Sequence, residues 1–77
     1  MKIQIVLHSS LRSLLPAEAK GRTTLDLPDG SRLSEVVDSL RIPSGTVCAV
    51  NGQIEADEER LLADGDEVRF LRRSAGG

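Results

Sequence analysis

The chain has 77 residues, the length of one small domain, and its 39% hydrophobic and 29% charged residues are typical of a folded chain rather than a disordered one. One cysteine and one histidine exclude a disulfide-stapled scaffold and a zinc site, and a net charge of −2 argues against nucleic acid as a partner. The apolar run at residues 3–7 is too short for a signal peptide or a membrane span, so we expect a cytoplasmic protein without a membrane partner.

The first segment of the chain has the alternation of a strand with one buried face. The expected inward residues are Ile3, Ile5 and Leu7, and the expected outward residues are Lys2, Gln4, Val6 and His8. Leu11, Leu14 and Leu15 then recur at helical spacing. They indicate one short helical turn that ends near Pro16. The β-rich segment 22–27 predicts the second arm of a hairpin, and residues 28–30 predict a turn after it.

Residues 31–40 contain the one clear helix pattern of the sequence. Its apolar stripe, at positions i, i+3, i+4 and i+7, consists of Leu33, Val36, Val37 and Leu40. Ser31 or Arg32 is the expected N-cap, and Ser31 is the better acceptor because its hydroxyl can accept from a helix N–H. Glu35 falls in the first turn, where the helix dipole favours a carboxylate. The Ile-Pro-Ser-Gly segment at 42–45 ends the helix.

The remaining residues predict short strands and tight turns. Residues 46–50 form a nearly all-apolar strand, and Asn51-Gly52 is a strong hairpin signal before a brief return strand at 53–54. An acidic loop at 55–60 and an apolar pair at 61–62 follow. The last strand covers 67–71, with Val68 and Phe70 inward.

One helix among these strands indicates an α+β fold. A hairpin, a crossover helix and a late strand are the components of a β-grasp domain. We therefore expect a mixed sheet of four or five strands with the main helix packed on one face. Residues 1–71 are assigned to this domain, and residues 72–77 to a flexible C-terminal tail that ends in Gly-Gly.

The tail contains no hydrophobic side chain large enough to anchor it, and it ends in Ser74, Ala75, Gly76 and Gly77. Glycine has no Cβ, so such a segment fits a narrow channel that leads to another protein's active site. The carboxylate of Gly77 would there attack the α-phosphate of ATP and become an acyl-adenylate. The plainer alternative is a frayed chain end.

Several segments carry a family resemblance. They are Leu11-Arg12, Leu33-Ser34-Glu35-Val36-Val37, Ala49-Val50-Asn51-Gly52, and Leu62-Ala63-Asp64-Gly65-Asp66-Glu67-Val68 followed by the terminal Gly76-Gly77. On these residues the chain resembles the MoaD/ThiS family of ubiquitin-like sulfur carriers, of which molybdopterin synthase small subunits are members. The resemblance covers essentially the whole chain, and Asp-Gly-Asp-Glu-Val combined with a terminal Gly-Gly is its most specific part.

The resemblance implies a protein substrate without catalytic residues of its own and without a bound metal or cofactor. In the family, an adenylating enzyme of the ubiquitin-activating type (MoeB/ThiF-like) uses ATP and Mg²⁺ to activate the terminal glycine, here Gly77. The product is converted to a thiocarboxylate, which donates sulfur to a synthase subunit in molybdopterin or thiamine biosynthesis. Ser74, Ala75 and Gly76 would thread the tail into these partners, and the free carrier would be a monomer.

The resemblance also places partner docking on the outward face of the sheet. The alternation assigns Val6 and His8 of the first strand, and Arg69 and Leu71 of the last, to that face. First and last strands are neighbours in a β-grasp sheet. Val6 and Leu71 are therefore expected to form a small exposed apolar pair beside the tail.

The sequence leaves open both the sulfur-transfer pathway and two alternative functions. Arg72 and Arg73 stand where MoaD-type members usually carry two prolines, so molybdopterin, thiazole and other sulfur-transfer routes all remain. One alternative function is a ubiquitin-like modifier joined to lysines through Gly77. Another is a binding module with an inert tail.

The other candidates for chemistry have plainer interpretations. Cys48 is expected to be a buried small hydrophobe, and residues 64–66 a tight turn rather than a metal site. His8 has no acidic partner at the spacing of a hydrolytic triad. The acidic segment 55–67 is either a solvated rim or a patch that steers a basic partner.

Overall fold

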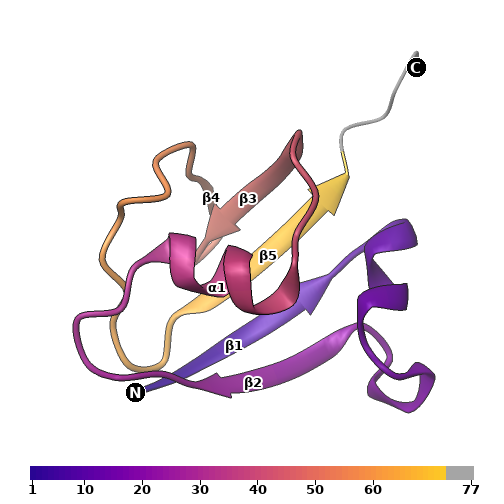
Figure 1. The fold of residues 1–77 in the computed structure, drawn as a ribbon, viewed down its shortest axis with the longest axis horizontal. Coiled ribbons are helices and arrows are strands. Elements are labelled where there is room, and N and C mark those ends of the chain that lie inside the picture. Colours follow the sequence, from indigo (N-terminus) through magenta and orange to yellow (C-terminus); the bar gives the residue numbers. More distant parts are fainter. Residues whose placement is uncertain (73–77) are drawn as a thin grey trace.

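A computed structural model describes residues 1–72, and residues 73–77 lie outside the described part. The elements in chain order are β1 (Lys2–Leu7), the 3₁₀ helices η1 (Ser9–Leu14) and η2 (Ala17–Ala19), β2 (Arg22–Asp26), α1 (Leu33–Leu40), β3 (Thr46–Val50), β4 (Gln53–Ile54) and β5 (Glu67–Arg72). The strands form one mixed sheet in the order β2-β1-β5-β3-β4, with α1 across one face (Figure 1). This is the β-grasp arrangement that the sequence predicts.

The first and last strands, β1 and β5, pair in parallel at the centre of the sheet. Their register sets Ile5 beside Val68 and Leu7 beside Phe70, and all four side chains are buried. β2 pairs antiparallel with β1 on one side, and β3 pairs antiparallel with β5 on the other. The sheet is thus built outward from the two ends of the chain, and β5 ends next to the end of β1.

The core lies between the sheet and α1. It consists of Ile3, Ile5, Leu7, Leu11, Leu33, Val36, Cys48, Val50, Leu62, Val68 and Phe70. The inward residues expected from the alternation of β1 and β5 are therefore confirmed. Within the helix stripe, Leu33 and Val36 are fully buried, while Val37 and Leu40 pack at the edge of the core. No helix within residues 1–72 has the length and apolar character needed to cross a membrane.

The helix start decides between the two expected caps. α1 begins at Leu33 with Arg32 as its N-cap, so the cap is Arg32 and not the favoured candidate Ser31. Ser31 is buried, and its hydroxyl donates to the carbonyl of Pro28 at 2.7 Å, which closes the preceding turn instead. Glu35 in the first turn accepts from the Arg32 N–H at 2.7 Å, in agreement with its expected position.

The first N–H groups of α1 are satisfied by a segment far away in the sequence. Leu33 N–H donates to the Arg60 carbonyl and Ser34 N–H to the Glu58 carbonyl, both at 2.9 Å. In the same strip, the Leu62 N–H donates to the Ser31 carbonyl at 3.0 Å. Residues 58–62 therefore cap the helix in place of a side chain and hold it over the sheet.

The connection from β1 to β2 is longer and more regular than one helical turn. It contains η1 and η2, with Pro16 between them, and only part of the predicted leucine cluster is buried. Leu11 enters the core, while Leu14 is 40% exposed. At the other end of the chain, β5 includes Arg72, which pairs with Thr46, so the last strand extends one residue beyond the predicted range 67–71.

Gly21 ends this connection in a backbone position that only glycine fits. Its φ is +76°, and a Cβ at this position would lie 2.7 Å from the Leu7 carbonyl oxygen and 2.9 Å from Arg12 Cγ. We expect Gly21→Ala to destabilise the fold by about 2 kcal/mol or more, through the strained backbone and the clash together. Urea denaturation of the variant and the parent chain measures the difference.

Gly30→Ala is the matched control, because Gly30 has a φ of +87° but no atom within 4 Å of the place that a Cβ would occupy. This variant should lower the free energy of unfolding by about 1 kcal/mol, which is the cost of placing alanine at a positive φ. Equal losses of stability for the two variants would show that the atoms around Gly21 move aside for a Cβ at no cost in free energy.

Candidate functional site

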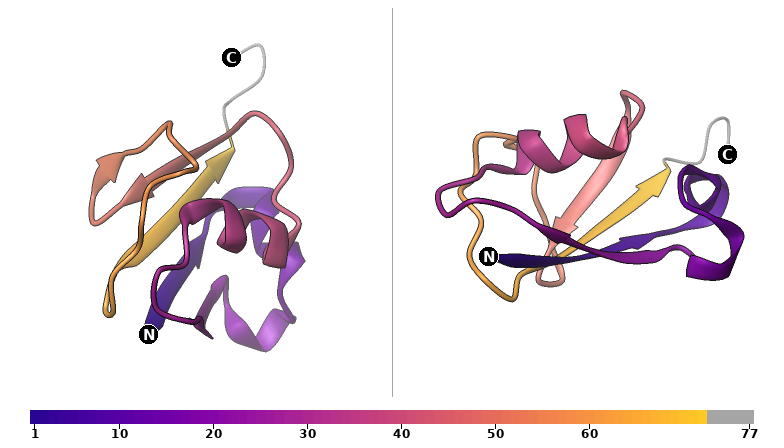
Figure 2. Two further views of the ribbon diagram at one scale, coloured as in Figure 1. Left: turned by 60° about the vertical axis from the view of Figure 1, so that its left-hand side comes forward. Right: turned by 60° about the horizontal axis from the view of Figure 1, so that its bottom comes forward.

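The two faces of the sheet differ in what covers them. α1 lies over one face, and within residues 1–72 no helix covers the opposite, open face (Figure 2). A single row of register partners crosses the open face over all five strands. It consists of Arg22, Val6, Arg69, Ala49 and Ile54. Of the residues expected for docking, Val6 and Arg69 lie in this row, with Arg69 at its centre.

Arg69 is held by contacts on both sides. Its Nε lies 2.7 Å from Glu67 Oε1 on the same strand, and its Nη1 lies 3.4 Å from His8 Nε2. The second contact is a hydrogen bond when Nε2 is unprotonated and accepts. The His8 backbone N–H in turn donates to the Phe70 carbonyl at 3.1 Å, which keeps His8 beside the end of β5. His8 and Arg69 thus form one half-buried polar pair.

The expectation that Val6 is exposed is wrong. Val6 does lie on the open face, but its side chain is only 6% exposed. The register places it between Arg22 and Arg69, and the methylene stems of long arginine side chains cover apolar neighbours while their heads stay in water. No exposed Val6–Leu71 pair therefore exists.

The open face has a different exposed apolar surface, at the β3–β4 end of the sheet. Leu71, which is 37% exposed, pairs with half-buried Val47, and Ile54, which is 70% exposed, pairs with buried Ala49. We call Leu71, Val47 and Ile54 the exit patch, because β5 ends one residue after Leu71, at Arg72. Leu71 was expected from the sequence, whereas Val47 and Ile54 were missed.

A signal for the missed residues was present in the composition of β3. A strand with apolar residues at consecutive positions presents apolar side chains on both faces, so Cys48 and Val50 face the core while Val47 and Ala49 face out. The pairing of β3 with β5, which joins Val47 to Leu71, depends on the tertiary fold.

The predicted reactive end of the chain falls beyond the described part. Gly77 and the threading residues Ser74, Ala75 and Gly76 lie outside the described residues. The last described residue, Arg72, is exposed and lies opposite Thr46 at the end of β5. The segment that leads to Gly77 therefore starts at the border of the exit patch.

The acidic turn at residues 64–66 is structural, as expected. Asp64 Oδ1 accepts from the Lys2 N–H at 2.7 Å, and Asp66 Oδ2 accepts from the Ala63 N–H at 2.9 Å. Asp66 Oδ1 also accepts from Asn51 Nδ2 at 2.9 Å, which ties the β3–β4 turn to the start of β5. Within residues 1–72 no cluster of histidine, cysteine and acidic residues could hold a metal ion.

Cys48 is buried on the covered side of β3, as predicted, with 9% of its surface exposed. Burial, and after it the charges of Glu55 and Glu58, raise the pKa of its thiol to about 11. The thiol is therefore protonated at neutral pH and is a poor nucleophile.

The acidic segment is partly neutralised by arginines. Arg60 Nη1 lies 3.0 Å from Glu55 Oε1, and Arg32 Nε lies 3.7 Å from Glu59 Oε2. The hydrogen bond from Arg60 lowers the pKa of Glu55 below its usual value. These contacts make part of the segment a structural rim around the start of α1.

The comparisons with known proteins identify one family through its family model. The ThiS family model matches residues 14–77. No curated protein sequence matches the chain.

Solved structures show the fold in more detail. SAMP1 of Haloferax volcanii superposes with a TM-score of 0.80 at 17% identity, covering 100% of both chains. A subunit of the molybdopterin-converting factor of Helicobacter pylori, from a complex of its subunits 1 and 2, gives 0.69 at 17% identity, again over 100% of both chains. The thiamine biosynthesis protein ThiS of Geobacter metallireducens gives 0.61 at 19% identity, over 96% of this chain and 99% of that one. At these identities the likeness shows a shared fold.

The raised pKa of Cys48 predicts low thiol reactivity in the folded state. Because the pKa moves from 9.0 to about 11, the folded chain holds about 100-fold less thiolate at neutral pH, and iodoacetamide should alkylate it at least that much more slowly than the urea-unfolded chain. Mass spectrometry of timed samples gives both rates. Equal rates in the two states would contradict the burial of the thiol.

The same shift predicts a pH window for stability. A thiol whose pKa is higher in the folded chain than in the unfolded chain stabilises the fold fully at pH values below the unfolded pKa of 9.0. This contribution to the free energy of unfolding is lost as the pH rises from 9.0 to about 11. The free energy of unfolding should therefore fall more steeply in this window for the parent chain than for Cys48→Ala. Parallel curves would show that Cys48 does not titrate differently in the fold.

Proposed function

Because this chain belongs to the ThiS family of ubiquitin-like sulfur carriers, we propose that it carries sulfur as a thiocarboxylate on Gly77 and has no catalytic centre of its own. The observation that carries the proposal is the family match over residues 14–77, which extends from the end of η1 through β2, α1, β3, β4 and β5 to Gly76 and Gly77. Glycine leaves the terminal carbonyl carbon open to attack, as acyl transfer at that carbon requires.

The proposed chemistry proceeds in two steps on a partner enzyme. A carboxylate oxygen of Gly77 attacks the α-phosphorus of ATP, the bond from that phosphorus to the bridging oxygen breaks, and pyrophosphate leaves with Mg²⁺. Hydrosulfide then attacks the acyl carbon, the bond to the AMP oxygen breaks, and AMP leaves. The released proton goes to solvent, and Gly77 keeps a thiocarboxylate. ATP and Mg²⁺ belong to the adenylating partner, of the MoeB/ThiF-like class.

The exit patch supplies the docking surface in this proposal. A partner enzyme recognises a carrier protein by the carrier's folded surface. Exposed apolar side chains on an otherwise polar surface are the usual basis of such contacts. Leu71 and Val47 lie at the point where the chain leaves β5. A partner that covers them is therefore placed to receive Gly77. His8 and Arg69 provide polar contacts at the same edge.

The proposed acceptor is a synthase subunit in cofactor biosynthesis of molybdopterin or thiamine type. Support comes from the Helicobacter pylori structure, which is a complex of subunits 1 and 2 of the molybdopterin-converting factor. The Geobacter metallireducens protein is named for thiamine biosynthesis, so the fold alone does not favour one route. We propose the cytoplasm as the setting, because ATP is present there and its reducing conditions keep thiols free.

A second candidate function is a protein modifier joined to lysine amines through Gly77. Support comes from a Haloferax volcanii structure named small archaeal modifier protein 1, with a TM-score of 0.77 at 15% identity. Both functions use the same adenylate, and they differ in whether hydrosulfide or an amine attacks the acyl carbon.

Intact mass measurement separates these functions. The full chain is incubated with a MoeB/ThiF-like enzyme, ATP, Mg²⁺ and sulfide, and we expect the mass increase for one oxygen replaced by sulfur. A chain without Gly77 should remain unchanged, because it lacks the reacting carboxylate position. An unchanged mass of the full chain with every such enzyme tried would overturn the carrier function. Adducts of protein size in cells would instead support the modifier.

The exit patch predicts a specific binding defect. Leu71→Ser should weaken binding to the adenylating enzyme about tenfold, because an apolar anchor at the centre of an interface is lost. Leu61→Ser is the matched control, since Leu61 is 57% exposed and lies outside the exit patch. Titration calorimetry measures both. Equal affinities for the two variants would show that the enzyme docks elsewhere.

A further inference from the structure

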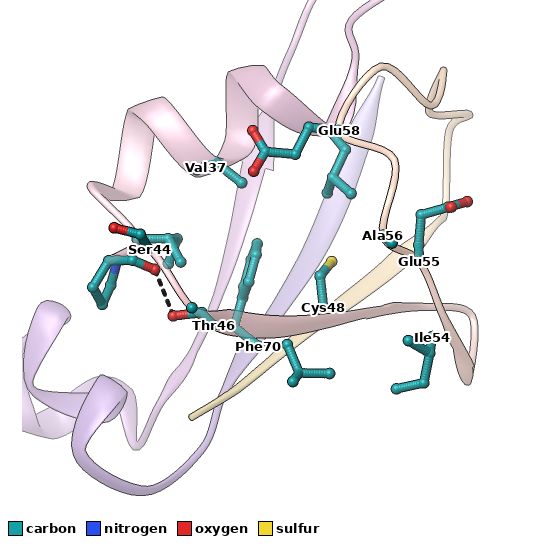
Figure 3. A pocket seen from close by; sticks show the side chains of 14 residues that line it. Val37, Ser44, Thr46, Cys48, Ile54, Glu55, Ala56, Glu58 and Phe70 are labelled. Atoms are coloured by element: carbon teal, nitrogen blue, oxygen red, sulfur yellow. Dashed lines mark hydrogen bonds between the residues drawn. The ribbon is translucent and has the colours of Figure 1, made fainter. Parts of the chain in front are cut away.

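A hollow of about 470 Å³ lies on the covered side of the sheet, between α1, β3 and residues 54–58 (Figure 3). It arises because α1 is only eight residues long and β4 only two, so neither closes over the end of β3. Its apolar walls include Val37 of α1, Ile42 after the helix and Phe70 of β5. Its volume is within the range of small-molecule sites, which is about 300–1,000 Å³.

Cys48 lies on the β3 side of the hollow. Its thiol points from the strand into the space below α1 (Figure 3), and its side chain is nine-tenths buried. Within residues 1–72 the thiol has no hydrogen-bond partner. The hollow therefore holds one unpartnered, weakly polar group among apolar walls.

A carboxylate lies at the opposite side. The Glu58 side chain reaches toward Val37 on the α1 side (Figure 3), and within residues 1–72 it makes no ion pair or side-chain hydrogen bond. The neighbouring acids differ, since Glu55 pairs with Arg60 and Glu59 with Arg32. Glu58 is thus the uncompensated charge of the hollow. Its field, with that of Glu55, reaches the Cys48 thiol and raises the pKa there.

We propose that this hollow binds a small organic cation, with its hydrocarbon body against Val37 and Phe70 and its protonated amine at the Glu58 carboxylate. The apolar walls attract the body of the ligand because burial removes it from water. The unpaired carboxylate selects the charge, since an anion is repelled and a neutral molecule of equal size gains no ion pair. The site serves no step at Gly77 and does not rest on the proposed carrier function.

The test is a two-dimensional ¹H–¹⁵N NMR titration of the full chain at low salt with three probes of one size: hexylammonium, hexanol and hexanoate. Hexylammonium should cause saturable shifts at Val37, Cys48 and Ala56, with an affinity about two- to fivefold above that of hexanol. Hexanoate should bind more weakly than hexanol. Glu58→Gln should remove the preference for the cation, whereas Glu59→Gln, which changes an acid outside the hollow, should keep it.

A second variant tests the location. Ala56 is exposed and lines the hollow, so Ala56→Trp should block it without altering the core, and the spectrum itself reports whether the fold is intact. All three probes should then lose their shifts. The proposal is overturned if no probe saturates, if hexanol binds as tightly as hexylammonium, if Glu58→Gln keeps the preference, or if folded Ala56→Trp still binds.

Discussion

The parallel pairing of β1 with β5 is the contact on which the rest of the molecule depends. It joins the two ends of the sequence through buried pairs such as Ile5 with Val68 and Leu7 with Phe70. Because parallel strands end at the same edge of a sheet, the pairing brings the exit of β5 next to His8. It also places Arg69 between β1 and β3. The open face acquires its composition only when this long-range pairing has formed.

Local patterns predicted most of the fold. The alternation in β1 and β5, the stripe of α1 and the Asn51-Gly52 turn are all properties of neighbouring residues, and the structure confirms them. The errors fall where distant segments meet. The preference for Ser31 over Arg32 as the helix cap was wrong, because carbonyls of residues 58–60 already satisfy the first helix N–H groups. Val6 was not exposed, and its register partners on the flanking strands are two long side chains, Arg22 and Arg69. Neither partner can be identified from the local sequence.

The two faces of the sheet carry different features. The open face combines the exit patch with the polar pair His8 and Arg69, at the edge where the chain leaves the sheet. The covered face carries the core and the hollow, with Glu58 at the α1 side. The sequence indicated the tail and Leu71 as candidate site residues, but the hollow depends on how far α1 extends over β3. The distance that α1 extends over β3 cannot be predicted from a local pattern in one sequence.

The burial of Cys48 has a consequence for the proposed chemistry, in which Gly77 becomes an activated acyl group. An acyl-adenylate is consumed by any thiolate or free amine that reaches it, and self-acylation would block the proposed sulfur transfer. The only cysteine of this chain is covered and protonated. Its basic residues are almost all arginines, with Lys2 and Lys20 as the only lysines, and guanidinium groups stay charged and unreactive. The folded chain thus contains few groups that would compete with an external sulfur donor.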